Sequence, residues 1–186
     1  MKFSCEKALL QAAVATASRA AAAKSTIPAL EGVLLQAGHS LTVSGYNMQT
    51  GIRTNLDADV TQEGALVLPA RLFGEIIRRM PDDVITFAAD TGMNVRLTCG
   101  DAAYNITALS ADDYPELPEV EDQYSIRIQQ QILRSMIGET SFAVSADEAR
   151  PIHTGSLFEI GEDSLTVVSV DGFRLALRRE PLQGVK

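Results

Sequence analysis

Apolar residues recur with a helical period in some stretches of the chain and alternate with polar residues in others. Lys2 to Cys5 alternates like a strand and leads into an Ala-rich helix predicted from Glu6 to about Ala21. A second helix is predicted to follow Pro69 and to run to about Met80. The predicted buried stripes are Leu9, Leu10, Ala13, Val14 and Ala17 on the first helix, and Leu72, Phe73, Ile76, Ile77 and Met80 on the second.

Alternating runs predict the strands around these helices. They cover residues 30–36, 41–44, 51–60, 65–68, 84–88, 94–99 and 104–109. The order of one strand, one helix and several strands therefore occurs twice, and each half contributes one helix and about four strands. We predict an α+β fold of repeated half-domains, in which two amphipathic helices pack on one face of antiparallel sheets.

The chain also contains a longer repeat. The opening stretch from Lys2 to Leu10 is echoed, 123 positions later, by Ser125 to Leu133. After one inserted residue, residues 40–43 are echoed by 164–167. A repeat of this size indicates duplicated domains. In the second copy, strands are predicted at 124–128, 155–160, 164–169 and 173–179, with a helix at 129–138.

The acidic, proline-bearing segment from Ser110 to Glu119 reads as an interdomain linker. It divides the chain into a first domain, 1–118, and the first half of a second domain, 119–186. On this division the rest of the second domain is absent.

The composition and charge limit the class of protein that this chain can be. The hydrophobic fraction of 46% is that of a globular protein, no apolar run is long enough to span a membrane, and no signal peptide is visible, so we expect a cytoplasmic protein. Cys5 and Cys99 lack metal-site spacing and are predicted to be reduced core residues. The net charge of −8 disfavours a protein that coats nucleic acid by bulk charge, but leaves room for a local basic face.

Catalytic chemistry is not indicated. The acidic pairs Asp82-Asp83 and Asp112-Asp113 fall in turns or linker, and neither His39 nor His153 has a partner that would make a metal or nucleophile site. No phosphate loop, zinc spacing or Ser/His/Asp set is recognisable. We therefore expect a protein that is not an enzyme and needs no cofactor and no metal.

Four segments in order carry a resemblance to a known family. They are Met1 to Phe3, Leu68 to Phe73, Ala108 to Pro115, and Val168 to Ala176. Together they resemble the bacterial DNA sliding clamp, the beta subunit of DNA polymerase III. The resemblance implies a DNA-clamp fold with three such domains per subunit, and a homodimer closed head to tail into a ring. This chain matches the N-terminal domain and part of the central domain.

The resemblance implies sequence-independent contacts to duplex DNA. Long cations on pore-lining helices attract phosphates without reading bases. The candidates are Arg71, Arg78 and Arg79 on the second helix, Lys7, Arg19 and Lys24 on or after the first, Arg134 on the third, and Arg150 in the following loop. The alternative is that these cations only solvate exposed helix faces. In that loop Asp147, Pro151 and Ile152 are poor phosphate ligands, so its contact with DNA stays open.

The resemblance also implies an apolar pocket for short peptide motifs of the replicative polymerase, the clamp loader and repair proteins. The matching residues are His153, Val170, Gly172, Phe173, Arg174 and Leu175, with Arg150 at the rim. Tyr104 matches an aromatic position at the subunit interface, although packing on its own sheet explains it equally well.

The implied function is a sliding clamp, a non-catalytic processivity factor in DNA replication. The alternative is a truncated clamp-like module that binds peptides without encircling DNA. A small enzyme using the acidic turns is the third and weakest reading.

Overall fold

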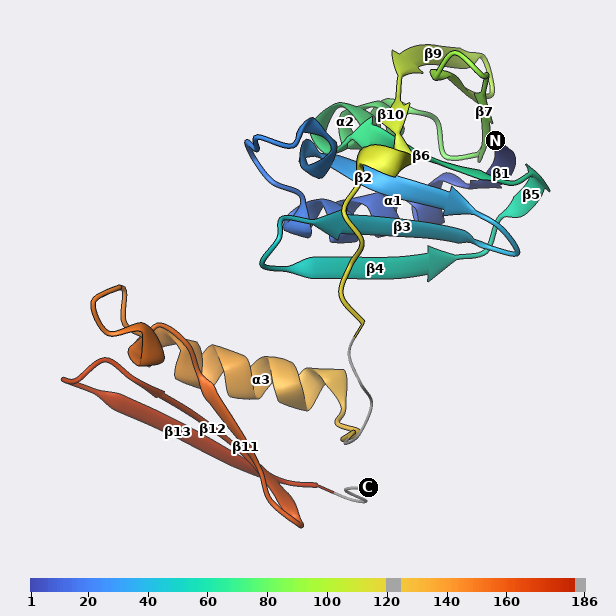
Figure 1. Cartoon of the computed structure of the whole chain (residues 1–186). Helices are drawn as coiled ribbons and strands as arrows, with labels where there is room; N and C mark the ends of the chain where they lie inside the picture. The colour runs from blue at the N-terminus through green and yellow to red at the C-terminus, as the bar shows by residue number, and fades with distance from the viewer. Residues whose placement is uncertain (120–124, 183–186) are drawn as a thin grey trace. The chain divides into compact units, whose positions relative to one another are not determined.

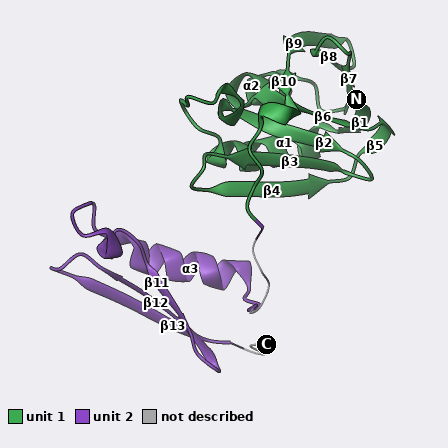
Figure 2. Cartoon of the chain, in the orientation of Figure 1, with its two compact units in different colours: residues 1–118 green, residues 119–186 purple. Residues whose placement is uncertain are grey.

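Residues 1–119 and 125–182 are described by a computed structural model, in which the chain divides into two units. Unit 1 is Met1–Pro118 and unit 2 is Glu119–Lys186, coloured separately in Figure 2. The predicted strand residue Tyr124 lies outside the described residues. In the described part of the chain, no helix combines the length and the apolar character needed to cross a membrane.

Unit 1 contains two five-stranded antiparallel sheets (Figure 1). The first has the order β5-β1-β7-β8-β9, with bounds Asp59–Gln62, Lys2–Glu6, Val84–Ala89, Asn94–Cys99 and Ala102–Thr107. The second has the order β10-β6-β2-β3-β4, with bounds Leu109–Ser110, Gly64–Pro69, Gly32–Ala37, Leu41–Tyr46 and Gly51–Leu56. The two orders correspond strand for strand, so unit 1 is built from two equivalent halves.

The halves exchange strands. β1 precedes the first helix yet pairs with β7 of the other half, and β6 precedes the second helix yet pairs with β2. The predicted strand at 51–60 is wrong because it is two strands: β4 and β5 lie in different sheets, and Asp57 and Ala58 carry the chain between them. The predicted strand at 104–109 divides in the same way at Ala108.

The two helices of unit 1 bury equivalent stripes. In α1 (Lys7–Ala17) the buried residues are Leu10, Ala13, Val14 and Ala17, and the buried residues around α2 (Ala70–Arg79) include Phe73, Ile76, Ile77 and Met80. Both sets follow the spacing i, i+3, i+4, i+7. Leu9 and Leu72, predicted to be buried, are exposed because each precedes its stripe by one residue, about 100° around the helix.

The predicted linker begins later than expected. Ser110 accepts a hydrogen bond from the Asp112 amide at 3.2 Å at the start of a 3-10 turn, η3 (Ala111–Asp113). The next residue, Tyr114, is buried against Ala29, Leu30, Tyr46 and Val67. Its hydroxyl donates to the Ser44 carbonyl at 3.4 Å. This segment therefore belongs to unit 1, because its aromatic ring completes a small core.

Unit 2 packs one helix, α3 (Gln130–Thr140), on a three-stranded antiparallel sheet with the order β11-β12-β13. The strands are Leu157–Ile160, Ser164–Val170 and Leu175–Pro181, and the core contains Met136, Leu165, Val167 and Leu182. The expected strand at 125–128 is wrong, since these residues are not in a strand. Its counterpart β1 has partners on both sides, whereas no described strand of unit 2 pairs with 125–128.

Candidate functional site

The basic stripe of α2 is exposed as the spacing predicts. Arg71, Arg78 and Arg79 all point away from the buried row that contains Phe73 and Ile77. Arg71 Nε lies 3.5 Å from Glu75 Oε1, so part of its charge is compensated. Arg78 and Arg79 make no ion pair with any described residue and end the helix, where cations also complement the helix dipole.

Lys7 does not join this stripe. Its Nζ lies 2.6 Å from Asp82 Oδ1, and its side chain is only 11% exposed. The expectation that Lys7 faces DNA is therefore wrong, because the amine is engaged by a carboxylate from the turn after α2. The exposed side of α1 is otherwise built from small and neutral residues, among them Ala12 and Thr16.

The remaining predicted cations are exposed but belong to different units. Arg19 lies in the 3-10 turn after α1, and Lys24 lies in the loop that follows it, both in unit 1. Arg134 on α3 and Arg150 in the loop before β11 are exposed in unit 2. Within each unit, exposure leaves these side chains free to reach a phosphate.

The predicted peptide residues gather at the turn between β12 and β13. Val170 and Leu175 form the last pair of the ladder, and Gly172 adopts φ 93°, a conformation that favours glycine. Asp171 Oδ1 accepts the amides of Phe173 at 2.9 Å and Arg174 at 3.0 Å. These amides, followed by the Arg174 side chain, hold the pKa of Asp171 below its usual range.

This turn exposes a large aromatic side chain. Phe173 is 100% exposed and Leu175 beside it is also exposed. Asp171 Oδ2 accepts from Arg174 Nε at 2.7 Å, and the guanidinium carbon lies 5.8 Å from the centre of the Phe142 ring. Phe142, in the 3-10 turn after α3, is a residue that the sequence reasoning missed. Its only signal was an aromatic residue just beyond the predicted helix.

Arg150 reaches the same turn, and His153 is hydrogen-bonded to Arg150 in the loop before β11. Arg150 Nη1 lies 3.5 Å from the point that a Cβ atom on Gly172 would occupy, so the guanidinium reaches the turn. The His153 amide donates to the Arg150 carbonyl at 2.9 Å, and Nδ1 is buried without a hydrogen-bond partner among the described residues. The structure thus brings Arg150 to the predicted pocket residues.

The loop before Arg150 is organised by Asp147. Its Oδ1 accepts the Ala149 amide at 3.0 Å, and its amide donates to Ser145 Oγ at 3.0 Å. The Asp147 carboxylate therefore supports the turn itself, while Pro151 and Ile152 are exposed. An acidic residue at position 147 is therefore explained by these turn contacts, although a carboxylate would repel a phosphate.

Tyr104 lies on β9, the edge strand of its sheet, opposite Leu97. Its ring is half-buried and packs against the core of unit 1. A position at a subunit interface is compatible with this placement, because β9 has no further strand partner in unit 1. Packing on its own sheet is also compatible, because the ring contacts the core of unit 1.

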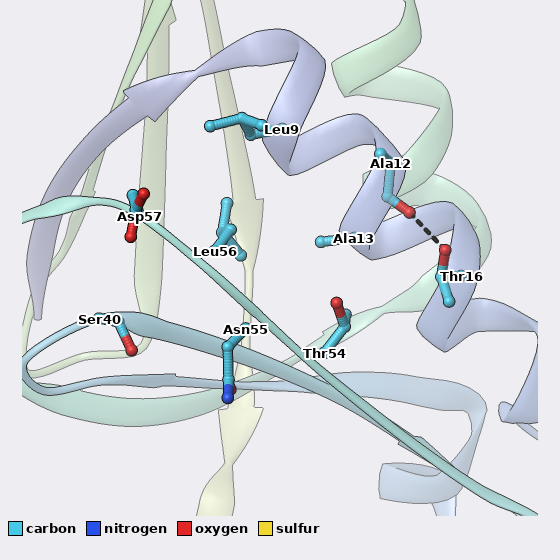
Figure 3. A pocket seen from close by; sticks show the side chains of 9 residues that line it. All are labelled: Leu9, Ala12, Ala13, Thr16, Ser40, Thr54, Asn55, Leu56 and Asp57. Atoms are coloured by element: carbon cyan, nitrogen blue, oxygen red, sulfur yellow. Dashed lines mark hydrogen bonds between the residues drawn. The ribbon is translucent and has the colours of Figure 1, made fainter. Parts of the chain in front are cut away.

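A separate hollow of about 420 Å³ lies between α1 and β4 (Figure 3). Leu9 and Leu56 give it an apolar side, and Thr54, Asn55 and Asp57 give it a polar one. Thr16 Oγ1, on its rim, donates to the Ala12 carbonyl at 2.8 Å. None of the predicted DNA or peptide residues lines this hollow. Within the described residues, no group of three or more His, Cys, Asp or Glu side chains could hold a metal ion.

Comparison with known proteins agrees with this geometry. Residues 1–118 match the N-terminal domain of the DNA polymerase III beta subunit, and residues 127–186 match its central domain. The beta sliding clamp of Halalkalibacterium halodurans is 33% identical over 192 residues, which cover 98% of this chain and 50% of that protein. That of Synechococcus elongatus is 33% identical, covering 95% and 48%. The chain spans about half the length of these curated relatives.

Solved structures give the same result. A putative DNA polymerase III beta subunit from Eubacterium rectale matches with a TM-score of 0.94 and 32% identity, covering 100% of this chain and 51% of that one. The DNA polymerase sliding clamp from Bacillus subtilis matches with a TM-score of 0.92 and 31% identity, covering 98% and 50%. The predicted clamp fold is confirmed, and the chain belongs to the DNA polymerase III beta subunit family, the beta sliding clamps.

Proposed function

We propose that this chain acts as part of a DNA sliding clamp, a non-catalytic processivity factor for the replicative DNA polymerase in the cytoplasm. In this proposal it slides on duplex DNA without reading sequence. It recruits the polymerase, the clamp loader and repair proteins through short peptide motifs, and its subunits pair head to tail around the DNA.

The exposed arginine stripe of α2 is the observation that carries the proposal. Arg71, Arg78 and Arg79 are long, mobile cations on one side of a helix in a chain whose net charge is −8. Such a stripe attracts phosphates wherever it lies along a duplex, while the acidic remainder of the protein repels them. A sliding protein needs this combination, because base contacts would hold it at particular sequences.

Salt-dependent binding to a short duplex tests the stripe. Replacing Arg78 and Arg79 by Gln should weaken binding equally for unrelated sequences, and each lost phosphate contact should reduce the slope of log K against log salt by about 0.9. Arg96→Gln is the matched control, because Arg96 is an exposed arginine on β8 of a sheet. Equal weakening by the control and by the helix variants would contradict the proposal.

The exposed turn at Phe173 favours a second candidate, a clamp-like module that binds peptides without encircling DNA. Two measurements separate the candidates: titration with a fluorescent clamp-motif peptide, and retention on circular duplex DNA before and after it is cut. Release on cutting supports the clamp. Peptide binding without retention on the circle supports the module.

A further inference from the structure

The turn between β12 and β13 contains the one Asp-Gly step of the sequence, Asp171-Gly172. A backbone amide reacts most easily with the side chain before it when it belongs to glycine, because no Cβ atom obstructs the approach. Gly172 is exposed, and its amide donates no hydrogen bond to any described residue. Apart from its chain neighbours, only Arg150 Nη1 among the described residues lies within 4 Å of the point that its Cβ atom would occupy.

The Asp171 side chain is folded over the backbone that follows it. Its Oδ1 accepts the amide of Phe173 at 2.9 Å and that of Arg174 at 3.0 Å. The Gly172 amide belongs to the peptide group that joins Asp171 to these donors. The carboxyl group and the free amide are therefore held within one tight turn.

The same turn keeps the carboxyl group ionised. Asp171 Oδ2 also accepts from Arg174 Nε at 2.7 Å. These contacts, the two amides first and then the guanidinium, hold the pKa of Asp171 below its usual range, because hydrogen bonds to a carboxylate favour the charged form. An amide nitrogen attacks a neutral carboxylic acid, which can lose water, far more readily than a carboxylate. The contacts that shape the turn therefore also restrain the reaction.

We propose that Asp171-Gly172 is a site of spontaneous isoaspartate formation, and that the Arg174 side chain holds its rate down. The Gly172 nitrogen forms a bond to Asp171 Cγ and loses its proton, and the carboxyl hydroxyl leaves with a proton as water, which closes a succinimide ring. Water then opens the ring. Addition at Cγ restores aspartate, whereas addition at the backbone carbonyl carbon breaks its bond to nitrogen and leaves isoaspartate. Water is the only co-reactant.

Isoaspartate would change this turn in two ways. The Asp171 Cβ atom enters the backbone, which lengthens the turn by one bond, and the free carboxylate moves to the Cα atom. The acceptor for the Phe173 and Arg174 amides is then displaced, directly beside Val170 and Leu175, the last pair of the ladder. The proposal rests on the geometry of this turn and not on the proposed clamp function.

Asp90 provides an internal comparison. Its Oδ1 accepts the amides of Gly92 at 2.8 Å and Asn94 at 2.9 Å, so its carboxylate is held much as that of Asp171 is. The residue after it is Thr91, whose branched Cβ obstructs approach to the amide nitrogen. We expect Asp90 to stay unmodified under conditions in which Asp171 reacts.

Peptide mapping by liquid chromatography and mass spectrometry tests the site on the full 186-residue chain, incubated at physiological temperature and neutral pH. Methyl transfer from S-adenosylmethionine by an isoaspartyl methyltransferase identifies the product. A synthetic peptide of residues 168–176 supplies the same sequence without the fold. We expect isoaspartate at Asp171 to accumulate in the chain more slowly than in the peptide, with none at Asp90.

Replacing Arg174 by Gln tests the restraint. The variant should form isoaspartate about threefold faster, a factor typical of the loss of one exposed ion pair. Arg134→Gln is the matched control, because Arg134 is an exposed arginine on α3 and should leave the rate unchanged. If Arg174→Gln lowers the thermal midpoint, Arg174→Lys keeps a cation at this position and should react more slowly than the Gln variant.

Three results would overturn the proposal. Absence of isoaspartate at Asp171 in the Arg174→Gln chain, once the peptide has largely converted, would show that the site does not react. Equal rates in the chain and the peptide, or equal rates at Asp171 and Asp90, would show that the turn does not control the reaction. Equal rates in the Arg174→Gln and Arg134→Gln chains would remove the role of Arg174.

Discussion

Truncating Tyr114 to Ala should destabilise unit 1 substantially, although the sequence places this residue in a linker. The ring is buried against Ala29, Leu30, Tyr46 and Val67, and an aromatic-to-Ala change in a core costs about 3–5 kcal/mol. This cluster is a small satellite of the main core and can partly collapse around the truncated side chain. We therefore expect the free energy of unfolding to fall by about 3 kcal/mol, at the low end of that range. At roughly 4 °C per kcal/mol for a domain of this size, the midpoint should fall by roughly 12 °C.

Tyr114→Phe removes the hydroxyl and keeps the ring, so it measures the contribution of the hydroxyl alone. The hydroxyl donates to the Ser44 carbonyl at 3.4 Å, which is long for an O–H···O bond, so its loss should cost less than about 1 kcal/mol. Calorimetry on the whole chain measures both variants. Because two units need not unfold together, hydrogen exchange in β2 and β3 assigns the transition to unit 1. Equal effects of the two variants, or an Ala variant within about 1 kcal/mol of the native chain, would refute the reasoning.

Three further changes have defined outcomes. Gly45→Ala should destabilise unit 1 by about 3 kcal/mol in urea unfolding, because its Cβ would lie 1.9 Å from the Ala17 carbonyl oxygen, whereas Gly38→Ala, with nothing within 4 Å, should be nearly neutral. Burial raises the pKa of Tyr114 from 10.0 to about 12, so its contribution to stability is complete below pH 10 and is lost towards pH 12; the Phe variant should lose less stability over that range. The lowered pKa of Asp171 means that its stabilisation is complete above the unfolded value near 3.8 and is lost as pH falls through the folded pKa; amide shifts in the turn should report this loss, and their absence would contradict it.

Local periodicity predicted most helices and strands because it reports which side of an element is buried. It could not predict which strands pair. The run from Gly51 to Val60 alternates without interruption, yet Asp57 and Ala58 divide it between two sheets. The alternation continues through Asp57 and Ala58 because β4 and β5 are both edge strands with one face exposed to solvent. The missing strand at 125–128 has the same cause, because a strand needs a partner that its own sequence does not specify.

Some residues of the candidate site could also be predicted from local spacing, whereas others depend on contacts between distant parts of the sequence. The α2 arginines could be found from spacing alone, because exposure on a helix follows from its period. Lys7 was misjudged since its partner Asp82 lies 75 residues away in sequence, beyond any local pattern. Phe142 was missed for a comparable reason: only the fold brings its ring within 5.8 Å of the Arg174 guanidinium.

The exchange of strands between the halves of unit 1 has a consequence for the order of folding. Lys2 pairs with Ala88, and Phe3 pairs with Phe87, so β1 waits for more than eighty further residues to be translated before this ladder can form. Closing so long a loop costs entropy before any contact repays it, which slows folding of high-contact-order topologies. During synthesis β5 is therefore the first partner that β1 can meet, and the side of β1 that faces β7 stays open until most of unit 1 has been translated.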